Sequence, residues 1–335
     1  MRSDAPDPVV PPNDVEPATE SGYWRTYRWR AMGSEVELLI GGATDADGLA
    51  AWAREEIERL EQCWSRFRAN SELVALNNRS GQWVDVSTTL ATALRSATRW
   101  WRDTGGAFDP TVIEALESWG YNQDFRLIRA SGAGGAGGSN DASDPPRAAP
   151  GLTGMASLHD YHSVRLPPGV RVDLGGIGKG LAADVVAQEL LTRGAPSVLV
   201  SMGGDLAMAG AAPSGGYPVP VLDPFDTERV LFTHALFEGA LVTSTTRIRR
   251  WRAEDTPAHH LIDPRTGCPA THGLAAVFVA APSCAQAEVL AKSVLVSGDV
   301  RLPMAMGAGT SGWTVDDDGQ LRALPAPSVH GALAA

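Results

Sequence analysis

The N-terminal third of the chain changes from an alternating to a helical pattern of apolar residues. In RAMGSEVELLIGG, residues 30–42, Val36, Leu38 and Ile40 alternate before a pair of glycines, which predicts a β-strand. From Asp47 to Phe67 the spacing becomes three and four residues, typical of one face of a helix. The residues on that face are Ala53, Ile57, Leu60, Trp64 and Phe67. A second helix is predicted over about 87–104, before two glycines that end it.

Strands and helices also alternate in the rest of the chain. VRVDLGG (170–176) and GLAAVFVAAP (273–282) predict strands, and SVLVSMGGDLAMAG (197–210) predicts two strands joined at a glycine turn. KGLAADVVAQELLTRG (179–194) and SCAQAEVLAKSVLVSG (283–298) predict helices. The second opens with a capping box, in which Ser283 is the N-cap and Gln286 lies three residues on. This mixture predicts an α/β or α+β fold with mixed sheets flanked by helices.

The domain organisation follows from composition. Residues 1–22 are rich in Pro and acids and are predicted to be a disordered tail, and 326–335 a C-terminal tail. Residues 23–325 are predicted to form one domain. Within it, residues 129–151 are rich in Gly, Ala, Ser and Pro, and we expect a flexible insertion there because large apolar residues are few.

Charge and cysteine content exclude several classes of function. The formal net charge of -11 argues against a nucleic-acid-binding surface, although RIRRWR (247–252) is a local basic run that a solvated strand edge also explains. Cys63, Cys268 and Cys284 have no metal-ligand spacing and suggest a reducing compartment. No stretch looks like a signal peptide or a membrane span, so we expect a cytoplasmic protein without membrane insertion.

Three glycine-rich turns each contain an acidic residue, and we call them glycine-acid corners. DLGGIGKG (173–180) leads from an extended segment into a helix and carries Lys179, an arrangement that suits pyrophosphate but is also that of a simple tight turn. The Walker pattern does not fit, and the dinucleotide-binding pattern fits only weakly, from Gly178 to Ala183, too far into the helix. TGGAFDPTV (104–112) contains Asp109, and SMGGDLAMAG contains Asp205. Three such corners in one chain favour a ligand that carries a phosphate or a metal.

These segments together resemble the FAD:protein FMN transferase family, also called the ApbE family. The resemblance includes AMGSEVELLI, SRFRANSELVALNN, TGGAFDPTV followed by ESWGY, VDLGGIGKGLAADVVAQEL, VLVSMGGDLAMAG, LVTSTTRIRRW, HHLIDPRTGCPA and VFVAAPSCAQAEVLAKSVLVSG. It implies an ApbE-like flavin transferase fold. It also implies that FAD is cleaved at its pyrophosphate and that FMN is attached through a phosphoester to a Ser or Thr of an acceptor protein, with Mg²⁺ as the metal.

The resemblance also implies the site residues. His260 is the candidate to take the proton of the acceptor hydroxyl, while His259 is expected to be a bystander and Asp263 structural. The predicted FAD pocket consists of Met32, Phe67, Ala107, Phe108, Asp109, Asp173, Lys179 and Leu261. The predicted metal positions are Gly176, through its carbonyl, and Glu288 and Lys292, where the family commonly has Asp and Thr.

Two departures from the family pattern leave alternatives open. A protonated Lys292 cannot ligate Mg²⁺, so its ammonium either replaces part of the metal's charge or forms a plain i,i+4 salt bridge with Glu288. Thr245 and Thr246 stand where many members have Gly-Asp. The rival functions are a flavin-binding protein without transferase activity and an FAD pyrophosphatase that releases FMN and AMP.

Overall fold

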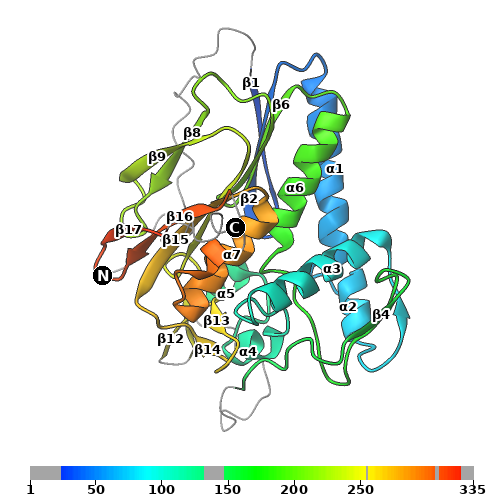
Figure 1. Cartoon of the computed structure of the whole chain (residues 1–335). Coiled ribbons are helices and arrows are strands. Elements are labelled where there is room, and N and C mark those ends of the chain that lie inside the picture. The colour runs from blue at the N-terminus through cyan, green and yellow to red at the C-terminus, as the bar shows by residue number, and fades with distance from the viewer. Residues whose placement is uncertain (1–23, 132–146, 254–255, 306–308, 326–335) are drawn as a thin grey trace, which may run out of the picture.

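A large antiparallel sheet forms the centre of the protein (Figure 1). The computed structural model describes residues 24–131, 147–253, 256–305 and 309–325. The sheet has eight strands in the order β1-β2-β6-β7-β10-β15-β16-β17, and every neighbouring pair is antiparallel. The strands are β1 (Trp24–Ala31), β2 (Ser34–Gly41), β6 (Ser197–Met202), β7 (Asp205–Gly210), β10 (Gly239–Thr245), β15 (Leu274–Ala281), β16 (Ser311–Asp316) and β17 (Leu321–Ala323).

Three helices cover one face of this sheet. They are α1 (Ala46–Trp64), α6 (Gly178–Thr192) and α7 (Cys284–Ser297). α7 packs on β10 and β15, α6 packs on β6 and β7, and α1 lies beside α6 (Figure 1). Successive strand residues point to opposite faces, so Leu38 joins the core under the helices while Leu39 joins a second core. The hairpin of β8 (Tyr217–Leu222) and β9 (Val230–Leu236) covers that second core.

The remaining helices are α2 (Glu72–Asn77), α3 (Thr88–Asp103), α4 (Ile113–Ser118), α5 (Phe125–Ser131) and α8 (Leu302–Ala305). The short strands are β3 (Val84–Asp85), β4 (Ala156–Leu158), β5 (Ser163–Arg165), β11 (Arg250–Ala253), β12 (Thr256–His259), β13 (Ile262–Asp263) and β14 (Cys268–Pro269). Among the helices in the described ranges, none has both the length and the apolar composition needed to cross a membrane.

The predicted mixed α and β architecture is confirmed, in its α+β form. The alternating segment forms β2, the two helical patterns form α1 and α3, and the glycine turn joins β6 to β7. α7 begins at the predicted N-cap, because the Ser283 hydroxyl accepts a hydrogen bond of 3.3 Å from the backbone N–H of Gln286. The side chain of Gln286 bonds Thr310 instead of completing the capping box. Gly298 ends α7 in the left-handed conformation.

Two predictions of local structure were wrong. Phe67 does not share the buried face of α1, because the helix ends at Trp64 and the Phe67 side chain is 42% exposed. Residues 170–176 form no strand. The Asn77 side chain bonds both the N–H and the carbonyl of Val172, at 2.9 and 2.8 Å, so a side-chain amide takes the place of a neighbouring strand.

The domain boundaries remain predictions. The two predicted tails and residues 132–146 of the predicted insertion lie outside the described residues. Of the described part of the insertion, residues 129–131 end α5, and residues 147–151 are bonded to the rest of the protein. Ala149 donates to the Pro264 carbonyl at 2.7 Å, and Gly151 donates to the Thr111 hydroxyl at 2.9 Å.

Candidate functional site

A buried group of charged side chains lies where the first turn of α6 meets α7. Lys179, from α6, pairs with Asp205 at the start of β7, and its Nζ also lies 3.5 Å from Oε1 of Glu288. Lys292, one turn after Glu288 on α7, places its Nζ 2.5 Å from the same oxygen. The side chains of Glu288 and Asp205 are 0% and 2% exposed, and those of Lys179 and Lys292 are 15% and 14% exposed.

Gly180 allows α6 and α7 to come close enough to build this group. A Cβ at position 180 would lie 2.6 Å from backbone atoms of Cys284 and Ala285, so only glycine fits. The backbone N–H of Gly180 donates to Oε2 of Glu288 at 2.7 Å. In return, the carboxylate of Asp184 on α6 accepts from the N–H groups of Cys284 and Ala285, at 2.7 and 2.9 Å. Each helix therefore supplies a carboxylate to the N-terminal turn of the other.

The charges of this group influence one another strongly. Burial raises the pKa of Glu288, but the Lys292 and Lys179 ammonium groups outweigh it and hold that pKa below its usual value. Burial lowers the pKa of Lys179 to about 8, with Lys292 and Arg249 adding to this effect and Glu288 opposing it. Lys179 is therefore mostly charged at neutral pH and close enough to titration to respond to a bound anion.

His260 lies near the same cations, and one of its ring nitrogens is unpaired among the described residues. Its Nδ1 is buried and has no hydrogen-bond partner among the described residues. Burial and the nearby charges of Arg249, Lys292 and Lys179 hold its pKa well below the usual value. His260 is therefore a neutral imidazole near pH 7, which is the form that accepts a proton.

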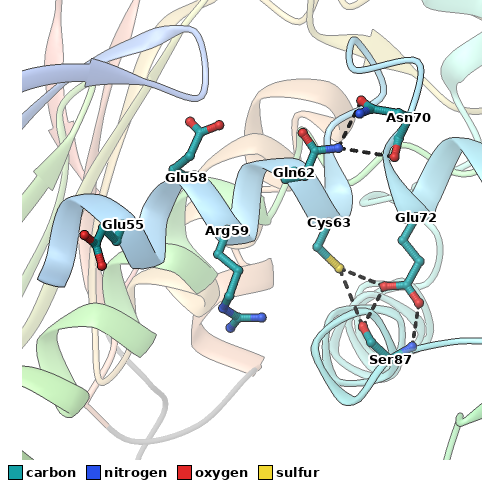
Figure 2. A pocket seen from close by; sticks show the side chains of 8 residues that line it. All are labelled: Glu55, Glu58, Arg59, Gln62, Cys63, Asn70, Glu72 and Ser87. Atoms are coloured by element: carbon teal, nitrogen blue, oxygen red, sulfur yellow. Dashed lines mark hydrogen bonds between the residues drawn. The ribbon is translucent and has the colours of Figure 1, made fainter.

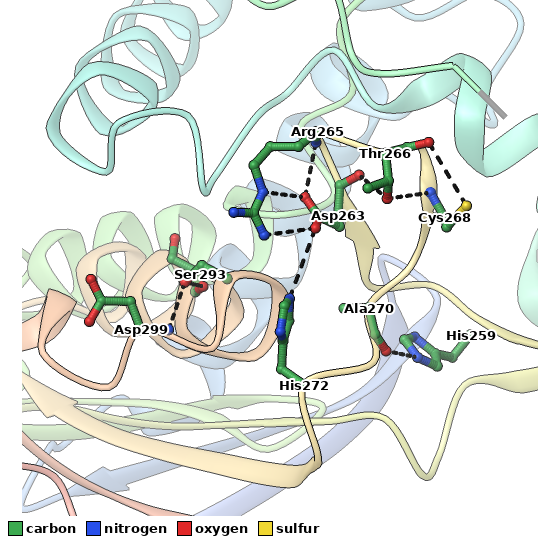
Figure 3. Close-up of polar contacts among 10 residues, drawn as sticks. His259, Asp263, Arg265, Thr266, Cys268, Ala270, His272, Ser293 and Asp299 are labelled. Carbon is green, nitrogen blue, oxygen red and sulfur yellow. Dashed lines mark hydrogen bonds and ion pairs between the residues drawn. The ribbon is translucent and has the colours of Figure 1, made fainter.

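His259 is engaged in the backbone of its turn. Its Nε2 lies 3.1 Å from the carbonyl oxygen of Ala270, as Figure 3 shows, and its Nδ1 accepts from the N–H of Leu261 at 3.3 Å. These two bonds fix a neutral ring with the proton on Nε2. Both ring nitrogens are used, which agrees with the expectation that His259 is a bystander.

Asp263 holds the turn that follows the histidines. Its carboxylate accepts from the backbone N–H of Arg265 at 2.9 Å and forms an ion pair with the guanidinium at 2.9 Å (Figure 3). His272 approaches the same carboxylate at 3.9 Å. Gly267, with a positive φ of 70°, lies so close to the backbone of Arg147 that a side chain would not fit. These contacts agree with a structural role for Asp263.

An aromatic cluster lies on the other side of the loop before α6. Arg66 forms a buried ion pair with Asp173, Nε to Oδ2 3.2 Å, and its guanidinium stacks over Phe67 and Tyr121 at 4.1 and 4.9 Å. Trp251 lies 5.4 Å from the Tyr121 ring. The exposed face of Phe67 is therefore backed by a cation and further rings, and it is available to a planar ligand.

Met32 occupies a strained position at the β1–β2 hairpin. Met32 and Gly33 both have positive φ, 50° and 66°, as a two-residue type I′ turn requires. For methionine this backbone conformation is unfavourable. The Met32 N–H donates to Glu61 at 2.9 Å, which helps to hold it. The next strand begins at Ser34, whose hydroxyl accepts a hydrogen bond of 3.2 Å from Arg249. This bond joins the hairpin to Arg249, one of the cations near His260.

The other predicted pocket residues differ in how much surface they offer. Phe108 contacts Gly176, since a Cβ there would lie 2.9 Å from the ring and 4.0 Å from Cδ of Lys292. Asp109 is saturated by two bonds from Thr111, at 2.6 and 2.8 Å, and one from Trp101 at 3.1 Å, and burial raises its pKa. Leu261 is 3% exposed within the main core, whereas Ala107 is partly exposed.

The predicted site residues thus fall into two groups. Lys179, Glu288, Lys292 and His260 come together, with Gly176 and Phe108 beside them. Phe67 and Asp173 meet at Arg66. Sequence reasoning did not assign Asp205 or Arg249 to the site. Asp205 lies in the third glycine-acid corner, and Arg249 lies in the basic run 247–252. Neither pattern indicates which distant residue the side chain contacts.

A shallow hollow on α1 is separate from this site (Figure 2). Its lining includes Glu55, Arg59, Cys63, Glu72 and Ser87. The Cys63 thiol donates to Glu72 at 3.2 Å, and burial raises its pKa to about 12. The thiol therefore stays neutral and unreactive.

The donor set around Glu288 does not fit a divalent metal at the predicted position. Oε2 is occupied by the Gly180 N–H, and Oε1 by two ammonium groups, one of them at 2.5 Å. Within the described ranges, no group of three or more His, Cys, Asp or Glu side chains could hold a metal ion. Lys292, at the position expected to supply an oxygen ligand, brings a positive charge instead.

Comparisons with known proteins identify the relatives of this chain. The ApbE family model matches residues 32–308. An FAD:protein FMN transferase of Treponema pallidum is 28% identical over 254 residues, 72% of this chain and 69% of the relative. One of Salmonella typhimurium is 27% identical over 295 residues, 84% of this chain and 81% of the relative.

Two solved structures share the fold. The ApbE protein of Thermotoga maritima has a TM-score of 0.77 at 24% identity, covering 90% of this chain and 97% of the other. The flavin transferase ApbE of Vibrio cholerae has a TM-score of 0.72 at 22% identity, covering 92% and 99%.

Proposed function

Because the chain belongs to the ApbE family, we propose that it is an FAD:protein FMN transferase. It cleaves FAD at the pyrophosphate and attaches FMN through a phosphoester to a Ser or Thr of an acceptor protein. One observation carries this proposal beyond the family match. Two lysines and an arginine surround a neutral histidine whose buried Nδ1 has no hydrogen-bond partner in the described chain. A diphosphate needs the cations, and a hydroxyl nucleophile needs the free acceptor.

The proposed step exchanges one phosphoester partner for another. The acceptor hydroxyl oxygen attacks the phosphorus of the FMN half, and the bond from that phosphorus to the bridging oxygen breaks. The hydroxyl proton goes to His260, and the bridging oxygen leaves with AMP. Lys179 and Arg249 neutralise the charge that builds up on the phosphate oxygens. The products are flavinylated protein and AMP, with no change in oxidation state.

The flavin ring is assigned to the aromatic side of the site. The exposed face of Phe67 offers a stacking surface, with Met32, Ala107 and Phe108 as further candidates for contact. Asp109 and Asp173 are assigned to shaping the loops, because Thr111, Trp101 and Arg66 already occupy their carboxylates. Leu261 is assigned to packing in the main core.

Three finer points extend this proposal. The acceptor is a protein with an accessible Ser or Thr, because a neutral histidine base suits a hydroxyl group. We place the reaction in the cytoplasm, in keeping with the three free cysteines, and fractionation of the native cell tests this. The expected Mg²⁺ is not carried into the proposal, since the groups around Glu288 do not fit it.

One experiment separates transferase activity from the two rival functions. The purified protein is incubated with FAD and a pool of peptides that each contain one Ser or Thr, with and without Mg²⁺. A peptide that gains the mass of FMN less one water, together with free AMP, supports the transferase. Free FMN and AMP without peptide modification would indicate a pyrophosphatase. FAD that is bound but unchanged would indicate a flavin-binding protein.

A further inference from the structure

Both lysines of this chain lie in the candidate site. Among the 28 Lys and Arg residues, only Lys179 and Lys292 are lysines. Their ammonium groups lie 3.5 and 2.5 Å from one oxygen of the fully buried Glu288. Everywhere else the chain uses arginine for positive charge. A lysine supplies a compact point charge, which fits a confined position where the planar fork of arginine does not.

An ordinary i,i+4 salt bridge does not explain the Glu288–Lys292 pair. Such a bridge lies on a solvated helix face, whereas Glu288 is 0% exposed and Lys292 only 14%. Lys292 also lies beside Gly176, whose missing Cβ would approach its Cδ at 4.0 Å. The methylene stem of Lys292 therefore passes beside the glycine corner, the segment that the sequence pattern assigns to the diphosphate, while its ammonium bonds Glu288.

The cations of this region are side chains. Lys179, Lys292 and Arg249 contribute three positive charges near His260, and the carboxylates of Glu288, Asp205 and Asp184 balance them. Backbone N–H groups already bond Glu288 and Asp184, so the ammonium and guanidinium groups remain able to meet a diphosphate in a site of low polarity. A divalent cation at Glu288 would need to displace ammonium groups that already neutralise the same oxygen.

We propose that Lys292 takes the place of a divalent cation in this chain. Its ammonium neutralises the FAD diphosphate directly, and Glu288 is a positioning residue that holds the ammonium in place. FAD binding is then independent of Mg²⁺. This inference rests on the proposed function, because it assumes that FAD occupies the site.

The test compares FAD affinity with and without metal, measured from flavin fluorescence at constant ionic strength. For the unchanged protein, the Kd in EDTA and in MgCl₂ should agree within about twofold. Lys292→Met should raise the Kd about 10- to 100-fold in both conditions, because one charge-assisted contact is lost. The exposed Arg322→Met, on β17, removes one positive charge away from the site and should leave the Kd unchanged. Lys292→Thr should make binding tighter in Mg²⁺ than in EDTA, since it restores an oxygen ligand.

A labelling experiment gives a second readout that needs no variant. Reductive methylation modifies lysines, and this chain has only two besides its α-amino group. FAD in EDTA should protect both Lys179 and Lys292, as measured by peptide mass spectrometry. If Lys292→Met fails to fold, protection of Lys292 decides the question.

The outcomes distinguish this inference from the proposed function. FAD that binds only with Mg²⁺, an unchanged Kd for Lys292→Met, or an unprotected Lys292 would each overturn the inference and leave the proposed function standing. A protein that binds no FAD in either condition would overturn both.

Discussion

Replacing Gly180 with alanine tests whether the approach of α6 to α7 builds the site. The new Cβ would lie 2.6 Å from backbone atoms of Cys284 and Ala285, and an ordinary contact begins at 3.4 Å. The helices must therefore separate by about 0.8 Å at this point, because backbone atoms cannot rotate away. The same movement stretches the 2.7 Å bond from the Gly180 N–H to Glu288.

The expected loss of stability combines three effects. Overpacking costs about 1–3 kcal/mol, and a weakened bond to a buried carboxylate costs about 1.5–3 kcal/mol. Alanine returns about 1 kcal/mol through its higher helix propensity. The free energy of unfolding should fall by about 1.5–5 kcal/mol. FAD affinity should fall as well, because the displaced Glu288 no longer positions Lys292.

Gly178→Ala is the matched control, two residues earlier in the same helix. Its Cβ would meet Trp64 at 3.5 Å, an ordinary contact, and its φ is not positive. This variant should be unchanged or more stable by up to about 1 kcal/mol. Urea unfolding, followed by far-UV circular dichroism, measures both variants at a common m-value. If Gly180→Ala stays within about 0.5 kcal/mol of the unchanged protein, or if both variants lose the same stability, the packing argument is wrong.

Three further predictions concern the charged groups. His260→Ala should lower the rate of FMN transfer about 10²–10⁴-fold with FAD binding retained, and His259→Ala should lower it much less. Mass spectrometry of the acceptor at fixed reaction times measures both rates, and equal losses would contradict the assignment of His260. The value of kcat/KM should be nearly constant up to about pH 7, fall to about half near pH 8, and fall about tenfold per unit above about pH 9. The reason is that Lys179, whose pKa burial lowers to about 8, loses its charge over this range. A pH profile without this alkaline limb would refute the role of its charge. Arg66→Met should cost about 3–5 kcal/mol in urea unfolding, because it leaves the carboxylate of Asp173 buried without its ion pair, and adding Asp173→Asn should recover part of the loss.

Local patterns predicted the elements whose causes are local. The alternation through Val36 and Leu38 identified β2, and Ser283 and Gly298 marked both ends of α7, because caps depend on residues within one turn. Phe67 fitted the periodicity of α1, but periodicity does not show where a helix stops.

Long-range partners could not be predicted in the same way. Residues 170–176 have the composition of a strand, but Asn77, 95 residues before Val172, satisfies the backbone there. In the site, motif order indicated Lys179, Glu288, Lys292 and His260. The partnership of Lys179 with Asp205 depends on how β7 is placed against α6, which no local pattern contains. The hydrogen bond from Arg249 to Ser34 likewise depends on the tertiary arrangement and has no local pattern.

The hydrogen bond between Arg249 and Ser34 spans 215 residues of chain, and this has a consequence for protein synthesis. Segments that meet across such distances fold late, because the loop between them must close before any contact rewards it. The growing polypeptide carries Lys179 and Asp205 long before Glu288 and Lys292 leave the ribosome. An unfinished chain can therefore pair Lys179 with Asp205 but cannot complete the charged group, so the ability to capture flavin nucleotide arises only after α7 has been synthesised.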